Sequence, residues 1–422
     1  MNKRLSPFRL YAVTAFGFAL TMVSNTLEPS VLGHKVLQLV PERAATALGF
    51  TTAAGLIVAM LVQPIVGVFS DRTRSRLGRR LPYFFVGTLM VIACLYLIAA
   101  APAFGLVVAG VLLIQLSSNI VQGPWQALIP DQVPEEQRGR ASGLKAMLDI
   151  LAFVIGGYAA GTLVSKYKDW GPVAIYAAVS VPVVVYLFSL AITAIWAREK
   201  PDAIEGAPQR TIREALTRTF HVDFRSYPAF SWWFANRFLF WAGFIMVQAF
   251  LLLYMVKVVG MAQADAQAYV AQLTIVLGGA LVIVTLPSGW LADRIGRKPL
   301  VIAAGLAAVV GMSILLVARE IPILTIAGVI VGLAVGTFLS ANWALVTDIV
   351  PRAEAARYLG IANIATAGGS FVARFLGGAL IDPINLATNS TSAGYLTVYA
   401  IAAGCFLLSA VIVTRLPVPA GK

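Results

Sequence analysis

Long apolar stretches separated by short polar loops are the feature that most constrains this chain. A helix of about 18 or more apolar residues crosses the hydrocarbon core of a bilayer, because lipid forces every backbone group to find its hydrogen-bond partner within the segment. The sequence therefore predicts an all-α membrane protein with twelve transmembrane helices. These cover residues 8–31, 46–69, 82–101, 104–129, 141–165, 172–197, 229–256, 268–291, 299–318, 322–347, 356–381 and 394–415.

The composition argues against a soluble helical protein. Of the 422 residues, 59% are hydrophobic and 12% are charged, whereas about a quarter of the residues in a soluble domain are charged. A helix that faces water needs a polar stripe at helical spacing, and the stretch 95–116 has none. The lipid bilayer is therefore the expected surrounding of the chain.

The net charge of +13 is explained by membrane orientation. Of the 32 Lys and Arg residues, 23 lie in the termini and loops of one side, and six lie in the loops of the other side. Since positive loops face the cytoplasm, we expect both termini there, a location in the inner or plasma membrane, and no nucleic-acid partner. The three remaining basic residues, Lys145, Arg237 and Arg374, lie inside predicted helices.

A charged loop occurs twice, which indicates a duplicated chain. GVFSDRTRSRLGRRLP begins at Gly67 and returns in a shorter form, GWLADRIGRKP, at Gly289. Asp131-Gln-Val-Pro likewise returns as Asp348-Ile-Val-Pro at a similar separation along the chain. A parallel repeat of this kind is typical of transporter folds. The predicted domains are a six-helix half over 1–197, a cytoplasmic linker with a short amphipathic helix over 198–227, and a second six-helix half over 228–422.

These motifs resemble those of known transporters. Both loops resemble the G-x-x-x-D-R-x-G-R-R/K motif of the major facilitator superfamily. The run from Gln63 to Pro82 also resembles the QP-x-x-G-x-x-SDR-x-x-SR-x-GRR-x-P pattern of sucrose/proton symporters and of glycoside, pentoside and hexuronide transporters, and Asn119 to Asp131 resemble their N-x-x-QGP-x-x-AL-x-x-D pattern. The resemblance implies the major facilitator fold and secondary active transport by alternating access. The implied substrate is a small polar solute such as a sugar or glycoside.

The repeated loop is predicted to act as a conformational clasp. An Asp at the end of a helix accepts hydrogen bonds from a facing helix N-terminus, and Arg side chains anchor to acidic residues or lipid phosphates. Such a clasp would hold the inner ends of the two halves together in one state and break in the other. The alternative is a solvated basic loop that only sets topology. The clasp residues are Gly67, Asp71, Arg72, Gly78, Arg79, Arg80, Asp131, Gly289, Asp293, Arg294, Gly296, Arg297, Lys298 and Asp348.

Ionisable side chains inside the membrane are costly, so each is a candidate for function. Asp149 and Arg237 each lie about nine residues into a predicted helix, roughly 13 Å from its inner end, and in opposite halves. One hypothesis is an Asp149 to Arg237 pair that opens during transport or loses its charge to a proton. The other is a local pair, because Lys145 and Asp149 are four residues apart on one helix face. Both hypotheses stay open here.

Further polar and aromatic side chains complete the candidate substrate or coupling site. Glu28 precedes Pro29, where the first helix is expected to kink, and Arg374 lies in a Gly-rich stretch from which it would pair with Asp382 or with another carboxylate. Amides and aromatic rings suit a neutral sugar or polyol, although amides also form hydrogen bonds that only hold helices together. The remaining candidates are Asn25, Gln115, Asn119, Gln122, Gln126, Asn236, Trp241, Gln248, Asn342 and Trp343.

The fourth predicted helix departs from the sucrose symporters. Those proteins carry an acidic residue and an Arg at the positions corresponding to Gln115 and Gln126, where this chain has amides. If the charged pair serves coupling or sugar binding there, this chain uses other residues, carries another substrate or is a uniporter.

Missing motifs argue against other functional classes. The chain has no G-x-x-x-x-G-K-[ST] loop for ATP, and with only His34 and His221 it lacks the clustered ligands of a metal site. We therefore expect no enzyme activity, no cofactor and no metal. A proton is the expected coupling ion, because protonation neutralises a desolvated carboxylate, and sodium is the alternative. Proton-driven drug efflux and a non-transporting sensor on the same fold are the alternative functions. We expect a monomer.

Overall fold

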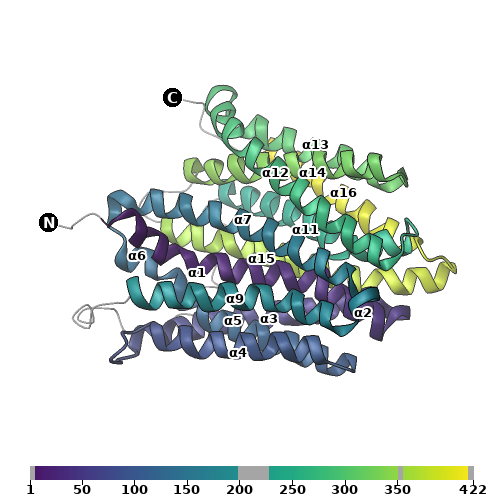
Figure 1. The fold of residues 1–422 in the computed structure, drawn as a ribbon. Helices are drawn as coiled ribbons and strands as arrows, with labels where there is room; N and C mark the ends of the chain where they lie inside the picture. Colours follow the sequence, from purple (N-terminus) through teal and green to yellow (C-terminus); the bar gives the residue numbers. More distant parts are fainter. Residues whose placement is uncertain (1–4, 198–227, 350–354, 417–422) are drawn as a thin grey trace. The chain divides into compact units, whose positions relative to one another are not determined.

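The computed structural model describes residues 5–197, 228–349 and 355–416, and within these ranges it contains twelve helical segments that are long and apolar enough to span a membrane. The prediction of an all-α protein with twelve spans is therefore confirmed. The predicted linker 198–227 lies outside the described residues. The long helices are α1 Pro7–Thr26, α3 Ala44–Arg72, α4 Leu81–Ala100, α5 Phe104–Gln126, α7 Arg138–Ser165, α9 Pro172–Trp196, α11 Pro228–Lys257, α12 Gln263–Ile295, α13 Arg297–Val317, α14 Ile321–Ile349, α15 Ala355–Thr388 and α16 Ala393–Thr414 (Figure 1).

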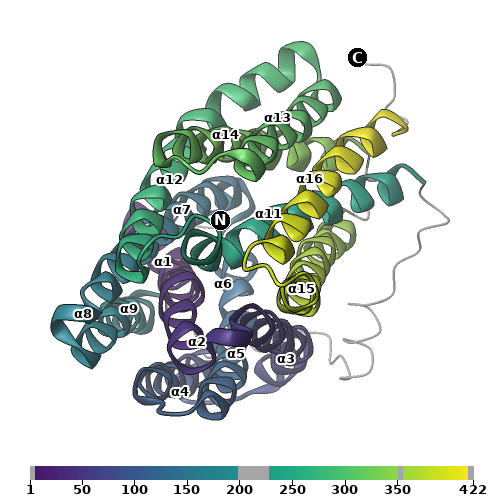
Figure 2. The ribbon, with the colours of Figure 1, turned by 90° about the vertical axis from the view of Figure 1, so that its right-hand side faces the viewer.

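The helices form two compact units. In unit 1, which comprises 5–41, 54–197 and 263–271 of the described residues, α1 packs on α7 and α9, and α4 packs on α5 and α9. In unit 2, which comprises 42–53, 228–262, 272–349 and 355–416, α11 packs on α15 and α16, and α13 packs on α14 and α16 (Figure 2). The first span of each unit thus lies against the fifth and sixth, and the third lies against the fourth and sixth. This common pattern agrees with a duplicated sequence.

Two short segments belong to a different unit from the rest of their helices. The beginning of α3 packs in unit 2, where a Cβ on Gly49 would lie 2.6 Å from the Cα of Gly378. The beginning of α12 packs in unit 1, where the amide of Gln267 donates to the carbonyl of Ser30 at 3.1 Å. The units therefore differ from the predicted halves at 42–53 and 263–271.

The first span is longer than predicted and contains a local change of helical winding. Between α1 and the short helix α2 Gly33–Leu39, residues Leu27–Leu32 form a π-helical turn. Pro29 lies in this turn and lacks the N–H that an α-helix would use, so the wider winding accommodates it without ending the span. The structure thus has a π-helical turn at Pro29, where the sequence predicted a kink.

The fourth span is interrupted near its end. α5 ends at Gln126, and the short helix α6 Leu128–Gln132 follows after Ala127. Pro124 lies in the last turn of α5 and removes one backbone donor from the ladder. The interruption places Asp131 on the short helix rather than on the long one.

Small residues allow the helices of unit 2 to approach closely, and this yields a first prediction. A Cβ on Gly369 of α15 would lie 2.5 Å from the carbonyl oxygen of Phe238 on α11, whereas a Cβ on Gly404 of α16 would meet no atom within 4 Å. We expect Gly369→Ala to lower the free energy of unfolding by about 1–3 kcal/mol through overpacking. Gly404→Ala should leave it unchanged or raise it by up to about 1 kcal/mol. Thermal unfolding in detergent measures both, and equal melting temperatures would contradict the close contact.

Candidate functional site

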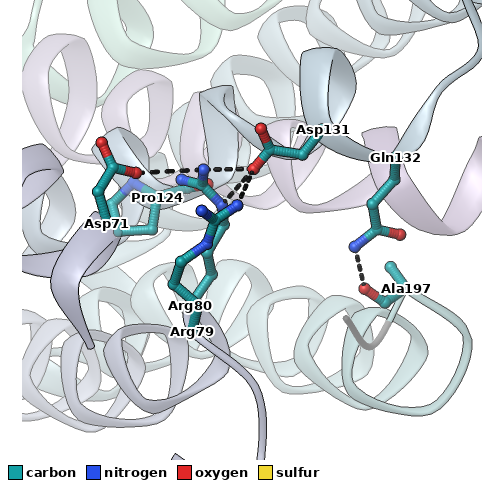
Figure 3. A network of polar contacts seen from close by, with 7 residues as sticks. All are labelled: Asp71, Arg79, Arg80, Pro124, Asp131, Gln132 and Ala197. Carbon is teal, nitrogen blue, oxygen red and sulfur yellow. Dashed lines mark hydrogen bonds and ion pairs between the residues drawn. The ribbon is translucent and has the colours of Figure 1, made fainter. Parts of the chain in front are cut away.

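The loop between α3 and α4 carries an arginine cluster that closes on one carboxylate (Figure 3). Arg79 donates to the Oδ2 atom of Asp131 at 2.7 Å, and Arg80 donates to the same oxygen through Nε at 2.9 Å and also through Nη2. Arg80 is buried, with 4% of its side chain exposed, while Asp131 is 30% exposed. Gly78 has a φ of 101°, a left-handed conformation that glycine adopts without strain. The loop therefore turns sharply and points two guanidinium groups at α6.

Asp71 has a partner within unit 1. Its Oδ1 accepts from Nη2 of Arg80 at 3.4 Å. Arg80 also reaches the carbonyl of Pro124 at 3.3 Å, which holds the guanidinium between the end of α3 and the end of α5. The predicted contact of Asp71 with a facing helix N-terminus stays a prediction. Gly67 and Arg72 lie on the last turns of α3, and Arg72 is exposed. Within unit 1, the predicted anchoring of Arg79 and Arg80 to an acidic residue is thus found at Asp131.

The second copy of the loop is anchored through backbone carbonyls. Arg297 donates to the carbonyl of Ala344 at 2.6 Å, and Lys298 donates to the carbonyls of Thr414 and Leu416 at 2.8 and 2.9 Å. Gly296 has a φ of 92°, which is positive like that of its counterpart Gly78 in the first copy. On the last turns of α12, which contain Gly289, the guanidinium of Arg294 lies 3.7 Å from the ring centroid of Trp290. The side chains of Asp293 and Asp348 lie outside the described part of the structure.

A charged pair lies inside the fifth span. Lys145 and Asp149 on α7 form an ion pair of 2.8 Å, and Asp149 also accepts from the hydroxyl of Thr21 on α1 at 3.1 Å. The Lys145 ammonium lies 5.3 Å from the ring centroid of Trp125, whose indole N–H donates to the carbonyl of Val13. Asp149 is roughly 17 Å along α7 from its beginning. Of the two pairings proposed from the sequence, the structure contains the local one.

The polar stripe of α5 faces α3. The amide of Asn119 donates to the carbonyl of Gln115 in its own helix at 2.8 Å, and Gln126 accepts from Gln63 of α3 at 2.8 Å. A Cβ on Gly55 would lie 2.9 Å from Cγ of Gln115. Gln122 is half-buried on the same helix. The stripe therefore serves at least partly to hold two helices together, as the alternative interpretation of the amides expected.

The polar residues of the first span lie one and two turns after Thr21. Asn25 donates to the carbonyl of Thr21 at 2.8 Å, and half-buried Glu28 lies in the π-helical turn. Thr21 was missed as a candidate, although its four-residue spacing from Asn25 places both on one helix face. Its hydroxyl is the group that connects α1 to Asp149.

A second polar cluster lies inside unit 2 around Arg237 of α11, which is 6% exposed. Arg237 donates through Nη1 to the amide oxygen of Asn342 on α14 and through Nε to the hydroxyl of Thr366 on α15, both at 3.0 Å. The amide of Asn342 donates to Asn236 at 2.8 Å, and Asn236 donates to the hydroxyl of Ser409 on α16 at 2.7 Å. One hydrogen-bonded chain thus joins four helices.

Three tryptophan rings surround the Arg237 guanidinium. The ring centroids of Trp343, Trp233 and Trp241 lie 4.7, 5.6 and 6.0 Å from its central carbon. The indole N–H of Trp233 donates to the carbonyl of Asn342, whereas the buried indole nitrogen of Trp241 has no hydrogen-bond partner among the described residues. Trp343 is 42% exposed. Trp233, Thr366 and Ser409 were not predicted, because α-helical hydroxyls and buried aromatics give no signal that separates them from ordinary packing residues.

The other candidates of unit 2 lie apart from this chain of hydrogen bonds. Arg374 on α15 is buried and donates to the carbonyl of Ser370 at 3.2 Å. Asp382 accepts from the backbone N–H of Thr46 at 2.7 Å, which caps the first turn of α3. The pairing of Arg374 with Asp382 or with another carboxylate stays a prediction. Gln248 is half-buried two turns beyond Trp241 on α11.

The twelve apolar spans of the described residues, the charged groups inside them and an arginine cluster at the loop between α3 and α4 define a multi-pass helical membrane protein of the transporter class. The family described as MFS/sugar transport protein matches residues 11–358, and the chain belongs to this family. Its members are transporters and not enzymes.

Individual relatives match shorter segments. The sucrose transport protein SUC3 of Arabidopsis thaliana is 28% identical over 145 residues, which are 29% of this chain and 24% of that protein. The sucrose transport protein SUT4 of Oryza sativa subsp. indica is 29% identical over 185 residues, which are 36% of this chain and 31% of that protein. The chain thus matches less than a third of the length of either relative.

A solved transporter has the same fold over nearly the whole chain. The crystal structure of the nucleoside transporter NupG superposes with a TM-score of 0.71 and 14% sequence identity, covering 97% of this chain and 99% of that one. At this identity the likeness is one of fold alone. It confirms the predicted major facilitator architecture.

Proposed function

We propose that the protein is a secondary active transporter that moves a sugar or another small polar solute across the membrane by alternating access, coupled to protons. The family supports transport, and two relatives are named as sucrose transport proteins. The excess of Lys and Arg in the loops of one side supports cytoplasmic termini and a location in the plasma or inner membrane. We also propose that the protein acts as a monomer.

The observation that carries this proposal is the Lys145 to Asp149 ion pair inside a membrane span. Charged side chains at such depth are expensive and are retained for ion or proton pathways. A proton that binds Asp149 discharges the pair and replaces the charge-assisted hydrogen bond from the hydroxyl of Thr21 on α1 with a weaker one to a neutral carboxyl group. The contact between α1 and α7 therefore depends on whether Asp149 carries a charge. Such a dependence is what proton coupling requires of a helix pair.

The polar and aromatic side chains within each unit support a hydroxylated solute. Amides on α5 of unit 1 offer hydrogen bonds, and indole rings on α11 and α14 of unit 2 offer flat apolar faces, and these suit the two kinds of surface on a sugar. The half-exposed ring of Trp343 lies beside the buried guanidinium of Arg237. An apolar drug would use the rings and leave the buried amides and the guanidinium without a role.

Uptake into proteoliposomes tests the proposal. The purified protein is reconstituted, and labelled sugars, other small polar solutes and apolar drugs are supplied with an inward proton gradient, with an inward sodium gradient, or with a protonophore. We expect at least one polar solute to accumulate only with the proton gradient. Accumulation that follows sodium alone would overturn proton coupling. Thermal stabilisation by a sugar without any flux would overturn transport in favour of a sensor, and proton-driven movement of apolar drugs alone would favour efflux.

A further inference from the structure

Arg237 is a buried cation whose described partners are all neutral. Its hydrogen bonds go to an amide oxygen and a hydroxyl, and its remaining contacts are tryptophan rings. Three carboxylates of unit 2 have described side chains, Glu42, Glu320 and Asp382, and none of them contacts Arg237. A buried charge without an opposite charge is unfavourable unless something else compensates it.

A second donor lies beside this cation. The indole nitrogen of Trp241 is buried and has no hydrogen-bond partner among the described residues, although its ring centroid is 6.0 Å from the guanidinium carbon. Buried indole N–H groups usually find an acceptor. The positive charge of Arg237 and this second donor of the same cluster match the single negative charge and the two oxygens of a carboxylate.

We propose that Arg237 and Trp241 bind a carboxylate of the transported solute, so that the substrate is a polyhydroxylated acid, such as a sugar acid, rather than a neutral sugar. The inference rests on the proposed transport function and specifies its substrate class. One buried cation balances one negative charge, which favours a carboxylate over a phosphate dianion. The exposed ring of Trp343, 4.7 Å from the same guanidinium, provides an apolar face for the carbon skeleton.

Asn342 is a positioning residue in this site. Its Oδ1 accepts from Nη1 of Arg237, and its Nδ2 donates to Asn236, which in turn is held by Ser409. The guanidinium is thereby fixed by the amide on one edge and by Thr366 at Nε. Asn342→Asp would place a carboxylate at nearly the same atoms and would supply Arg237 with an internal counter-ion. This variant keeps Arg237 but balances its charge within the protein, so that an external anion is no longer required as the counter-ion.

The test compares each acid with its neutral partner. Binding of glucose and glucuronate, galactose and galacturonate, and glucose 6-phosphate is measured by thermal shift and titration calorimetry, and flux is measured in proteoliposomes. We expect wild-type protein to bind at least one acid tenfold or more tightly than the matching sugar, and to transport it. Arg237→Gln and Asn342→Asp should both abolish this preference, and Arg237→Lys should keep part of it. Arg319→Gln, which makes the same charge change at a residue that donates to loop carbonyls, should leave it intact.

The outcomes separate the two proposals. Three results would overturn the carboxylate site: tighter binding of the neutral sugar than of the acid, the same preference for the acid in Arg237→Gln as in the wild type, or a response to glucose 6-phosphate alone. Asn342→Asp distinguishes loss of the carboxylate site from misfolding. A misfolded protein binds neither the acid nor the neutral sugar, whereas a folded protein in which Arg237 has an internal counter-ion loses only the acid. Transport of glucose without glucuronate overturns this inference alone, and binding of glucuronate without flux overturns the transport proposal alone. Absence of any response to the whole panel would overturn both.

Discussion

Replacement of Asp149 by Asn is expected to lower concentrative uptake tenfold or more, while the protein still exchanges solute across the membrane. Asp149 joins Lys145 at 2.8 Å and Thr21 at 3.1 Å, so one carboxylate links a charge on α7 to a hydroxyl on α1. An amide accepts the same hydroxyl but takes up no proton at neutral pH. The contact between α1 and α7 would then be neutral at position 149 at every pH. A proton gradient would have no titratable group there on which to act.

The measurement is uptake driven by a proton gradient beside counterflow of preloaded solute in the same proteoliposomes. Asp169→Asn on the short helix α8 Tyr167–Trp170 makes the same substitution at an exposed carboxylate and should behave as wild type. Because Asp149→Asn leaves Lys145 without its ion-pair partner, the double variant Lys145→Gln/Asp149→Asn restores neutrality. It should fold and remain uncoupled. Concentrative uptake with an unchanged pH dependence in Asp149→Asn would refute the coupling role.

A second large effect is expected at the arginine cluster of unit 1, where Asp131→Asn should lower the free energy of unfolding by about 2 kcal/mol. A hydrogen bond to a charged group contributes about 1.5–3 kcal/mol, and Asp131 accepts from both Arg79 and Arg80. The partial exposure of Asp131 places the expected effect toward the lower end. The buried guanidinium of Arg80 keeps the longer contact with Asp71 and the contact with the carbonyl of Pro124, but it loses the charge of its partner at position 131.

Thermal unfolding in detergent measures this loss, and a double-mutant cycle with Arg80→Gln isolates the pair. Glu136→Gln removes an exposed carboxylate five residues along the chain and should change the free energy of unfolding by less than about 0.5 kcal/mol. If the basic loop only set the topology of the chain, Asp131→Asn and Glu136→Gln would be indistinguishable. A coupling energy near zero in the double-mutant cycle would likewise indicate that the basic loop only sets the topology.

The candidate site was predictable in its residues but only partly in its contacts. Asp149, Arg237, Asn236 and Asn342 stood out because polar groups are rare in apolar spans. Their partners did not, since Thr21 and Ser409 resemble the many hydroxyls that bond to their own helix. The proposed Asp149 to Arg237 pair stays a prediction, because each residue is described within its own unit.

Sequence alone was sufficient for the twelve spans, the repeated loop and the family, because hydropathy, loop charge and motif spacing are local properties of each segment. Tertiary structure decided that Arg79 and Arg80 bind Asp131, that Lys145 pairs with Asp149, and that Arg237 is surrounded by amide, hydroxyl and indole groups. These contacts depend on the rotation of each helix about its axis and on how closely small residues such as Gly369 let two helices approach. Rotation and approach are set by packing between segments far apart in the chain, which no single segment encodes.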